Sequence, residues 1–188
     1  SNNVDVLVHD PWRPVPSLGG HAGVPSGSFD RGNLDCRTDV LTFTTDALTE
    51  PLQVAGTCVA RFYCRADAPS FDISAILSEV LPDGQVMNLT QGHICVLAGE
   101  QPAMPEPVPS EGSTDQPPLV EVPLQPTCFT LATGHALRLS IAAACFPAYA
   151  VNPGTGKPPG QSRLIEQRMI TLQILHGQAY PSRLDLSL

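Results

Sequence analysis

Short runs in which hydrophobic residues alternate with polar ones recur along most of the chain. In residues 57–65, Ala60 and Phe62 alternate with Arg61 and Arg65. A period of two is the pattern of a β-strand with one buried face and one partly wet face. Strand-like segments are predicted at residues 40–44, 57–65, 73–81, 85–89, 94–97, 120–124, 137–146, 169–175 and 184–188.

The clearest supersecondary element is a hairpin. Residues 73–81 and 85–89 flank the tripeptide Pro82-Asp83-Gly84. Proline fixes φ, aspartate bonds its own backbone, and glycine takes the left-handed position, so this tripeptide predicts a turn.

The number and length of these segments indicate the fold class. The chain predicts about eight to ten short strands and no convincing amphipathic helix. Its 20 prolines and 15 glycines show no repeat, so they mark turns between short elements. At 188 residues the chain is long enough for one sizeable core. The sequence therefore predicts a single all-β domain, a sandwich or jelly roll.

Two regions depart from the strand pattern. Residues 1–32 are rich in proline and glycine and predict an extended arm or linker, because residues before proline avoid the helical region. The β-sandwich domain then occupies residues 33–188. Within it, residues 99–118 hold six prolines and little apolar surface, which predicts a long mobile loop.

The charge of the chain argues against some classes of binding partner. The net charge is −8, Lys157 is the only lysine, and the arginines stand singly. No basic stripe is available for phosphates or acidic lipids, which argues against nucleic-acid and membrane roles. No apolar run approaches the ~20 residues that span a bilayer.

The six cysteines favour a reducing compartment. Four of them, Cys58, Cys64, Cys95 and Cys145, lie inside apolar strand-like runs, where a free thiol behaves as a small buried hydrophobe. We therefore expect reduced core thiols and a cytoplasmic protein, although sequence leaves one or two disulfides open.

A search for chemistry finds no catalytic centre. The nearest approach to a serine elbow, residues 160–164, lacks the second glycine and follows a loop instead of a strand. The five histidines lie in different segments, and none has a second histidine two or four residues away. The sequence thus predicts no catalytic residue, no metal site and no cofactor.

Aromatic residues are the best candidates for a contact surface. Phe62 and Tyr63 are adjacent in a predicted strand, so one of them must point away from the core. Trp12 stands in the arm, which needs something to lie against. Coverage of these rings by the chain's own loops is the alternative.

Several motifs follow one another along the chain: Asp10-Pro11-x-x-Pro14-Val15-Pro16-Ser17-Leu18-Gly19-Gly20, Arg37-x-Asp39-Val40-Leu41-x-Phe43-x-Thr45, Leu48-Thr49-Glu50-Pro51-Leu52, Pro82-Asp83-Gly84, Asn88-Leu89-Thr90-x-Gly92, Gly134-His135-x-Leu137-Arg138-Leu139, Phe146-Pro147, Asn152-Pro153-x-Thr155-Gly156 and Pro181-Ser182-Arg183-Leu184. Taken together, these motifs resemble the C-terminal domain shared by X-prolyl dipeptidyl-peptidases and bacterial cocaine esterase. The resemblance covers nearly the whole chain, and the order and spacing of the motifs make it specific.

The resemblance implies a non-catalytic jelly-roll sandwich of galactose-binding-like topology, which follows an α/β-hydrolase domain. In that family the catalytic serine, histidine and aspartate belong to the α/β-hydrolase domain, upstream of the linker. The resemblance therefore assigns no catalytic residue to this chain. By the same resemblance Phe62 and Tyr63 form part of a substrate-pocket rim, and Trp12, Pro14 and Pro16 contact the preceding domain. The family usually has an arginine where Cys95 stands.

The function predicted on this basis is that of an accessory domain of a serine hydrolase that cleaves an ester or an X-prolyl peptide bond. Its partner is the missing N-terminal α/β-hydrolase domain of the same polypeptide. A carbohydrate-binding module is one alternative, although residues 99–118 contain no aromatic platform for a sugar. A structural or homo-oligomerising domain, with the Trp12 arm on a neighbouring subunit, is another.

Overall fold

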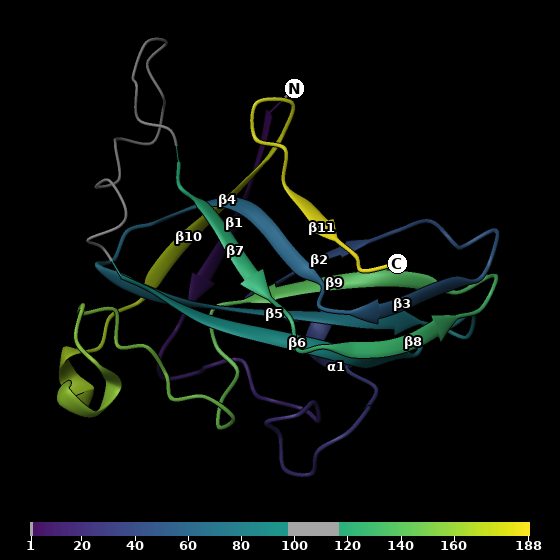
Figure 1. Cartoon of the computed structure of the whole chain (residues 1–188). Coiled ribbons are helices and arrows are strands. Elements are labelled where there is room, and N and C mark those ends of the chain that lie inside the picture. The colour runs from purple at the N-terminus through teal and green to yellow at the C-terminus, as the bar shows by residue number, and fades with distance from the viewer. Residues whose placement is uncertain (1, 98–116) are drawn as a thin grey trace.

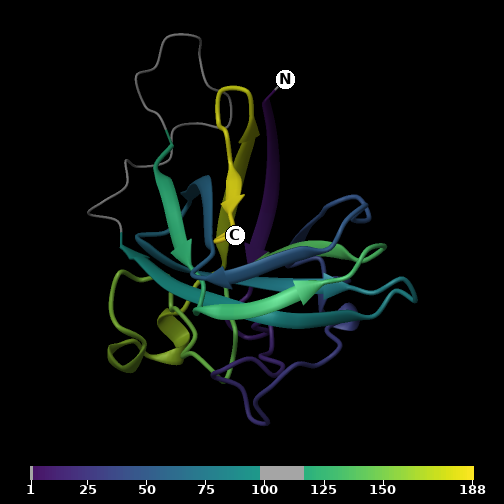
Figure 2. The same cartoon turned by 45° about the vertical axis from the view of Figure 1, so that its right-hand side comes forward.

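The computed structural model describes residues 2–97 and 117–188, which form two larger antiparallel sheets that face each other and a third sheet of two strands (Figures 1 and 2). Both views place the N-terminal strand in the sheet opposite β5 and β6. The first sheet contains β1 (Asn2–His9), β10 (Ile170–Gly177), β4 (Val59–Ala66), β11 (Arg183–Asp185) and β7 (Leu119–Pro123). The second contains β2 (Val40–Thr44), β9 (Ala136–Ala142), β5 (Ser70–Val80) and β6 (Val86–Leu97), and β3 (Leu52–Gly56) pairs with β8 (Thr127–Leu131). The helical turns are α1 (Gly32–Asp35), η1 (Pro159–Gln161) and η2 (Leu164–Glu166).

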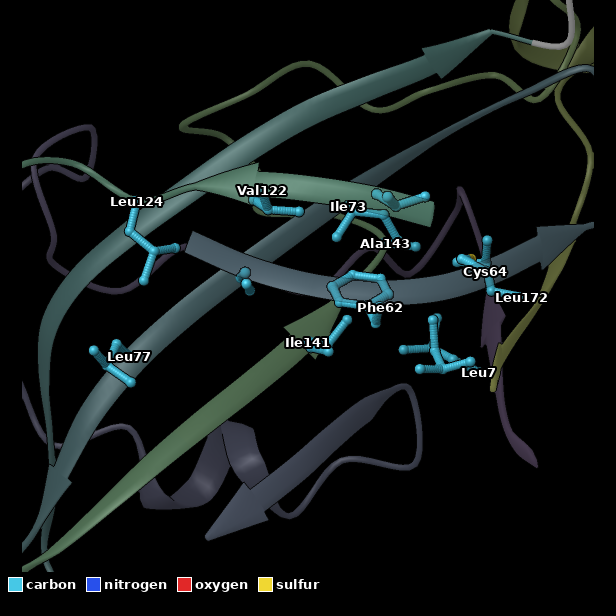
Figure 3. Close-up of a cluster of buried hydrophobic side chains, with 14 of the residues drawn as sticks. Leu7, Phe62, Cys64, Ile73, Leu77, Val122, Leu124, Ile141, Ala143 and Leu172 are labelled. Atoms are coloured by element: carbon cyan, nitrogen blue, oxygen red, sulfur yellow. The ribbon is translucent and has the colours of Figure 1, made fainter. Parts of the chain in front are cut away.

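The core lies between the two sheets (Figure 3). In β4 the side chains of Ala60, Phe62 and Cys64 are buried while their neighbours are half-buried, as a period of two requires. They pack against inward-facing residues of the opposite sheet, among them Ile73 and Ile141. The predicted all-β two-sheet architecture is confirmed, and the galactose-binding-like jelly-roll topology stays a prediction.

The hairpin is confirmed as well. Strands β5 and β6 pair in antiparallel register across the predicted turn. The Asp83 Oδ1 atom accepts a hydrogen bond from the Gln85 N–H at 3.1 Å, and Gly84 has a φ of 91°. Both features are those that the tripeptide requires.

β5 is buried on both faces. Phe71, Ile73 and Leu77 point into the core, whereas Ser70 and Asp72 point to the outer face and are buried there too. The outer face is covered because residues 10–31 and 143–169 run across it on the same side in both views. The molecule therefore has a polar buried layer beneath these loops, in addition to its apolar core.

The predicted arm divides into two parts. Residues 2–9 form β1, which pairs with β10 along its whole length and supplies Leu7 to the core. Residues 10–31 continue as an irregular segment against the second sheet. The predicted strand at 137–146 is shorter in the structure, where β9 ends at Ala142. The predicted long loop at 99–118 lies almost entirely outside the described residues.

All six cysteines are free thiols, and three of the four predicted core thiols are buried. Cys95 is the exception and corrects the prediction: it is exposed because it lies on the outer face of β6. Among the helices of the described residues, none has the length and apolar character needed to cross a membrane.

Gly92 of β6 lies where the chain after β7 crosses over the sheet. A Cβ atom at this position would stand 2.3 Å from the backbone oxygen of Pro123. We expect Gly92→Ala to lower the free energy of unfolding by about 1–3 kcal/mol, because the backbone must shift. Urea denaturation measures this, with Gly160→Ala as the control, since a Cβ there meets nothing within 4 Å. Equal losses in the two variants would contradict the close approach at Gly92.

Candidate functional site

The arm is fixed to the domain by backbone hydrogen bonds to the segment after β9. The Ser17 N–H donates to the Phe146 carbonyl at 2.6 Å, and the Phe146 N–H donates to the Val15 carbonyl at 3.0 Å. Val15 is buried in a small apolar cluster with Val40 and Ala142. The side chains of Trp12 and Phe146 are nevertheless 53% and 47% exposed.

A short finger projects from the arm. Gly20 and Gly27 exchange backbone hydrogen bonds of 2.7 and 3.1 Å, which closes its base. Gly20 has a φ of 71°, and a Cβ there would stand 2.1 Å from the Gln91 Oε1 atom, so the close approach requires glycine. The tip carries Val24, whose side chain is fully exposed.

A second loop, residues 147–169, lies beside the arm. It contains η2, whose N-terminus is capped by hydrogen bonds between Arg163 and Glu166. The side chains of Leu164 and Ile165 are 66% and 85% exposed on this turn. The Arg168 Nη2 atom donates to the Asp67 carbonyl at 3.0 Å and fastens the end of the loop.

These two segments present exposed apolar side chains on one side of the domain. Both lie against the outer face of the sheet that contains β5 and β6 (Figures 1 and 2). Single exposed apolar side chains are common on folded domains, whereas a contiguous group of them marks an interaction surface. We call the set of exposed apolar residues in the arm and in the chain after β9 the loop face; it consists of Trp12, Val24, Phe146, Leu164 and Ile165.

Beneath the loop face, a buried polar network holds the second loop. Asn152 is its centre: its Nδ2 atom donates to the Asp72 Oδ1 atom at 2.8 Å. Its Oδ1 atom accepts hydrogen bonds from the Ser70 hydroxyl and the Gly154 N–H, each at 2.9 Å. The Asn152 amide thus joins β5 to the loop that carries Leu164 and Ile165.

The same network reaches the finger through aromatic rings. The His93 Nε2 atom lies 3.3 Å from the Asp72 Oδ2 atom. The His93 ring stacks on the Tyr149 ring with centroids 4.0 Å apart. The Tyr149 hydroxyl is in turn 3.2 Å from the Nε2 atom of His21 in the finger. Arm, finger and second loop therefore form one connected layer on the outer face of the sheet.

A buried ion pair anchors the base of the arm. Arg31 is only 2% exposed, and its Nε atom lies 2.9 Å from the Asp35 Oδ1 atom. Ser140 of β9 also donates to Asp35 Oδ1, at 3.0 Å, and the Arg138 Nη1 atom lies 3.4 Å from Asp35 Oδ2. One carboxylate thus links the arm to β9.

His9, at the end of β1, is buried beside this layer, and its Nε2 atom has no hydrogen-bond partner among the residues that the structure describes. Burial lowers its pKa from the ordinary value of 6.5, although the nearby carboxylates of Asp72, Asp10 and Asp39 oppose the shift. The unfolded chain consequently binds the proton more tightly than the folded domain.

We expect stability to fall as the pH drops below about 6.5, because the unfolded state then gains a proton that the folded domain does not yet take up at His9. This loss of stability ends once the pH is below the pKa that His9 has in the folded domain. His9→Phe keeps a buried ring and removes the proton site, so it should abolish this part of the pH dependence. Urea unfolding of both proteins between pH 8 and pH 5 checks this, and parallel curves would contradict it.

The Cys95 thiol, beside the Asn152 network, is poorly suited to nucleophilic catalysis. Although the Cys95 residue is exposed, partial desolvation of its thiol and the neighbouring Asp72 carboxylate raise the pKa of this thiol to about 11. The group is therefore a neutral thiol at pH 7, and the thiolate is the nucleophilic form. Within residues 2–97 and 117–188, no group of three or more His, Cys, Asp and Glu side chains is arranged to hold a metal ion.

The residues predicted from sequence fall in two places. Phe62 is buried in the core, whereas Tyr63 lies on the outer face of the first sheet, where its ring packs 5.4 Å from that of Tyr180. The pair does point in opposite directions. Trp12 belongs to the loop face, with Pro14 half-buried and Pro16 exposed beside it.

The other four residues of the loop face were not predicted from sequence. Single hydrophobic residues in loops produce no periodic signal. The motif Gly19-Gly20 and the motif beginning at Asn152 were the available hints, since both mark backbone held close to the sheet.

Fold and site together define an all-β domain whose outer face carries a layer of fastened loops. The chain belongs to the family of X-Pro dipeptidyl-peptidase C-terminal non-catalytic domains, whose family model matches residues 4–185. The predicted membership in this family and the predicted non-catalytic role are thereby confirmed.

The proteins to which this chain is similar include longer hydrolases, and the chain matches one part of each. The chain is 30% identical to cocaine esterase of Rhodococcus sp. (strain MB1 Bresler) over 99% of its length and 32% of the esterase. A solved α-amino acid ester hydrolase is similar with a TM-score of 0.78 and 24% identity, covering 97% of this chain and 32% of that one. An aminopeptidase from a marine sediment Thaumarchaeota archaeon gives a TM-score of 0.79 at 22% identity, covering 99% and 33%. The chain spans about a third of the length of each of these relatives.

Proposed function

We propose that this domain follows an α/β-hydrolase domain in the same polypeptide and that the whole protein is a serine ester hydrolase. Acyl transfer would then be carried out by a Ser-His-Asp triad in that upstream domain. Ester hydrolysis is favoured over X-prolyl peptide cleavage because cocaine esterase and the α-amino acid ester hydrolase are both ester-cleaving by name. The free state of all six thiols supports a cytoplasmic location.

The loop face carries the proposal. Val24 and Ile165 are aliphatic, almost wholly exposed, and held by fastened backbone. A buried contact with a partner removes this apolar surface from water, which stabilises the assembly in proportion to the area covered. We infer that the loop face docks on the hydrolase domain and contributes to the rim of its substrate pocket.

The predicted interdomain contact of Trp12, Pro14 and Pro16 agrees with this orientation, because the Trp12 ring lies in the loop face. The prolines stiffen the backbone that presents it. Tyr63 lies on the outer face of the opposite sheet, so a single flat interface does not contact both Trp12 and Tyr63. The predicted pocket-rim role of Phe62 and Tyr63 stays a prediction, for which Tyr63 is the accessible member.

The experiment uses the full-length polypeptide and an aryl ester substrate. Val24→Asp and Ile165→Asp place a charge in the proposed interface, and displacement of a pocket wall should lower kcat/KM by about tenfold or more. Val6→Asp is the matched control, since Val6 is an exposed valine on the outer face of the other sheet. Unchanged kcat/KM in both loop-face variants, or an equal loss in the control, would show that the loop face is not the docking surface.

A second measurement tests the class of the whole protein. The full-length polypeptide should react with a fluorophosphonate at one serine upstream of this domain and lose its esterase activity. The 188-residue chain alone should show neither reaction. Esterase activity in this chain alone would refute an accessory role.

A further inference from the structure

A groove opens between the two sheets, away from the loop face. Its volume is about 330 Å³, and residues of β2 and β9 on one side face residues of β4, β10 and β11 on the other. Core side chains form its floor, namely Phe62, Ile141 and Ile174. Phe43 and His176 stand at its rim. These three floor side chains are themselves buried, so the groove is an indentation that ends on the closed core.

The charged groups around the groove already have partners. Arg61 and Arg183 both pair with Asp185. The His176 Nε2 atom lies 2.8 Å from the Asp5 Oδ2 atom. A charged ligand would have to compete with these pairs, whereas an uncharged apolar group meets an apolar floor. The groove thus suits a neutral apolar occupant, and water is a poor one.

One contact bridges the two sheets at the rim. The rings of Phe43 in β2 and His176 in β10 meet edge to face with centroids 5.9 Å apart. In the β1–β10 register, Asn3 pairs with His176 and Asn2 with Gly177. The start of β1 therefore lies beside the rim residue His176.

We propose that the groove is the binding site of an apolar segment of the same polypeptide, directly upstream of β1. This inference rests on the proposed function, since it requires a preceding hydrolase domain. The relatives are about three times as long as this chain, which supplies such a segment. Covalent attachment beside the groove gives the segment a high effective concentration, so modest apolar contacts are enough to hold it.

The first test compares the accessibility of two matched histidines. Each ring has one nitrogen on a carboxylate: His176 on Asp5 and His135 on Glu79, with side-chain exposures of 31% and 23%. His135 is not one of the residues that line the groove. Carbethoxylation by diethylpyrocarbonate, followed by peptide mass spectrometry, should modify both in the 188-residue chain. In the full-length protein the rate at His176 should fall about tenfold or more, and the rate at His135 should stay within about twofold.

The second test removes the rim contact. Phe43 is only partly buried, so Phe43→Asp should leave the 188-residue chain folded, as circular dichroism and urea unfolding would verify. In the full-length protein it should restore the reactivity of His176. A peptide with the sequence encoded directly upstream of Ser1 should bind the chain in a calorimetric titration, and Phe43→Asp should abolish that binding.

The outcomes separate the two proposals. An upstream hydrolase domain with His176 still reactive would overturn the groove proposal and leave the proposed function intact. Absence of any upstream hydrolase domain would overturn both. If light scattering shows a dimer of the 188-residue chain in which His176 is protected, a second copy is the occupant and the upstream segment is not.

Discussion

Replacing Asp35 with alanine is expected to lower the free energy of unfolding by about 3–5 kcal/mol, the usual result of breaking a buried ion pair. The Asp35 carboxylate accepts hydrogen bonds from Arg31, Ser140 and Arg138. Its loss leaves the Arg31 guanidinium 2% exposed with no opposing charge, and an unpaired buried charge is strongly unfavourable. Urea unfolding at pH 7 measures the change.

Two variants make this result specific. The double variant Arg31→Met/Asp35→Leu removes both charges and should recover much of the loss, because apolar residues of similar volume often replace a buried pair without penalty. Glu166→Ala breaks the exposed pair with Arg163 and should have little measurable effect. If Asp35→Ala behaves like Glu166→Ala, the ion pair is not what anchors the arm.

The strands were predictable wherever one face is buried and the other wet. β4 follows the alternation because Ala60, Phe62 and Cys64 face the core. β3 and β8 were missed, because each buries a single side chain, Val54 in β3 and Leu131 in β8. A strand with one buried residue shows no apolar alternation, and propensity alone is a weak signal.

The buried polar layer was not predictable from the same pattern. Ser70, Asp72 and Ser74 alternate with apolar residues in β5, which in sequence resembles a solvent-facing side. The arm and the second loop cover that side, and only the folded arrangement reveals it. The opposite holds for Val24 and Ile165, which are hydrophobic in sequence but exposed in the fold. Their position on the surface depends on tertiary anchors such as the Gly20–Gly27 bridge.

Replacing Asn152 with alanine is the second large effect we expect, about 2–4 kcal/mol of lost unfolding free energy, because several buried partners lose their hydrogen bonds together. The side chain serves the Asp72 carboxylate, the Ser70 hydroxyl and the Gly154 N–H. Asp72 is 5% exposed and loses its hydrogen bond from Asn152, although His93 and Cys95 remain beside it. Exposed Asn33 gives the control, since Asn33→Ala should change stability by less than about 0.5 kcal/mol.

The same variant connects stability to docking. Asn152 fastens the loop that carries Leu164 and Ile165, so its loss should free that loop even while the sandwich stays folded. Limited trypsin digestion should then cut after Arg163 or Arg168 faster in Asn152→Ala than in the parent chain, at a temperature where both are folded. In the full-length protein, kcat/KM should fall in parallel. Loss of stability with unchanged cleavage would mean that the network supports the sheet alone and that the loop face is held by other contacts.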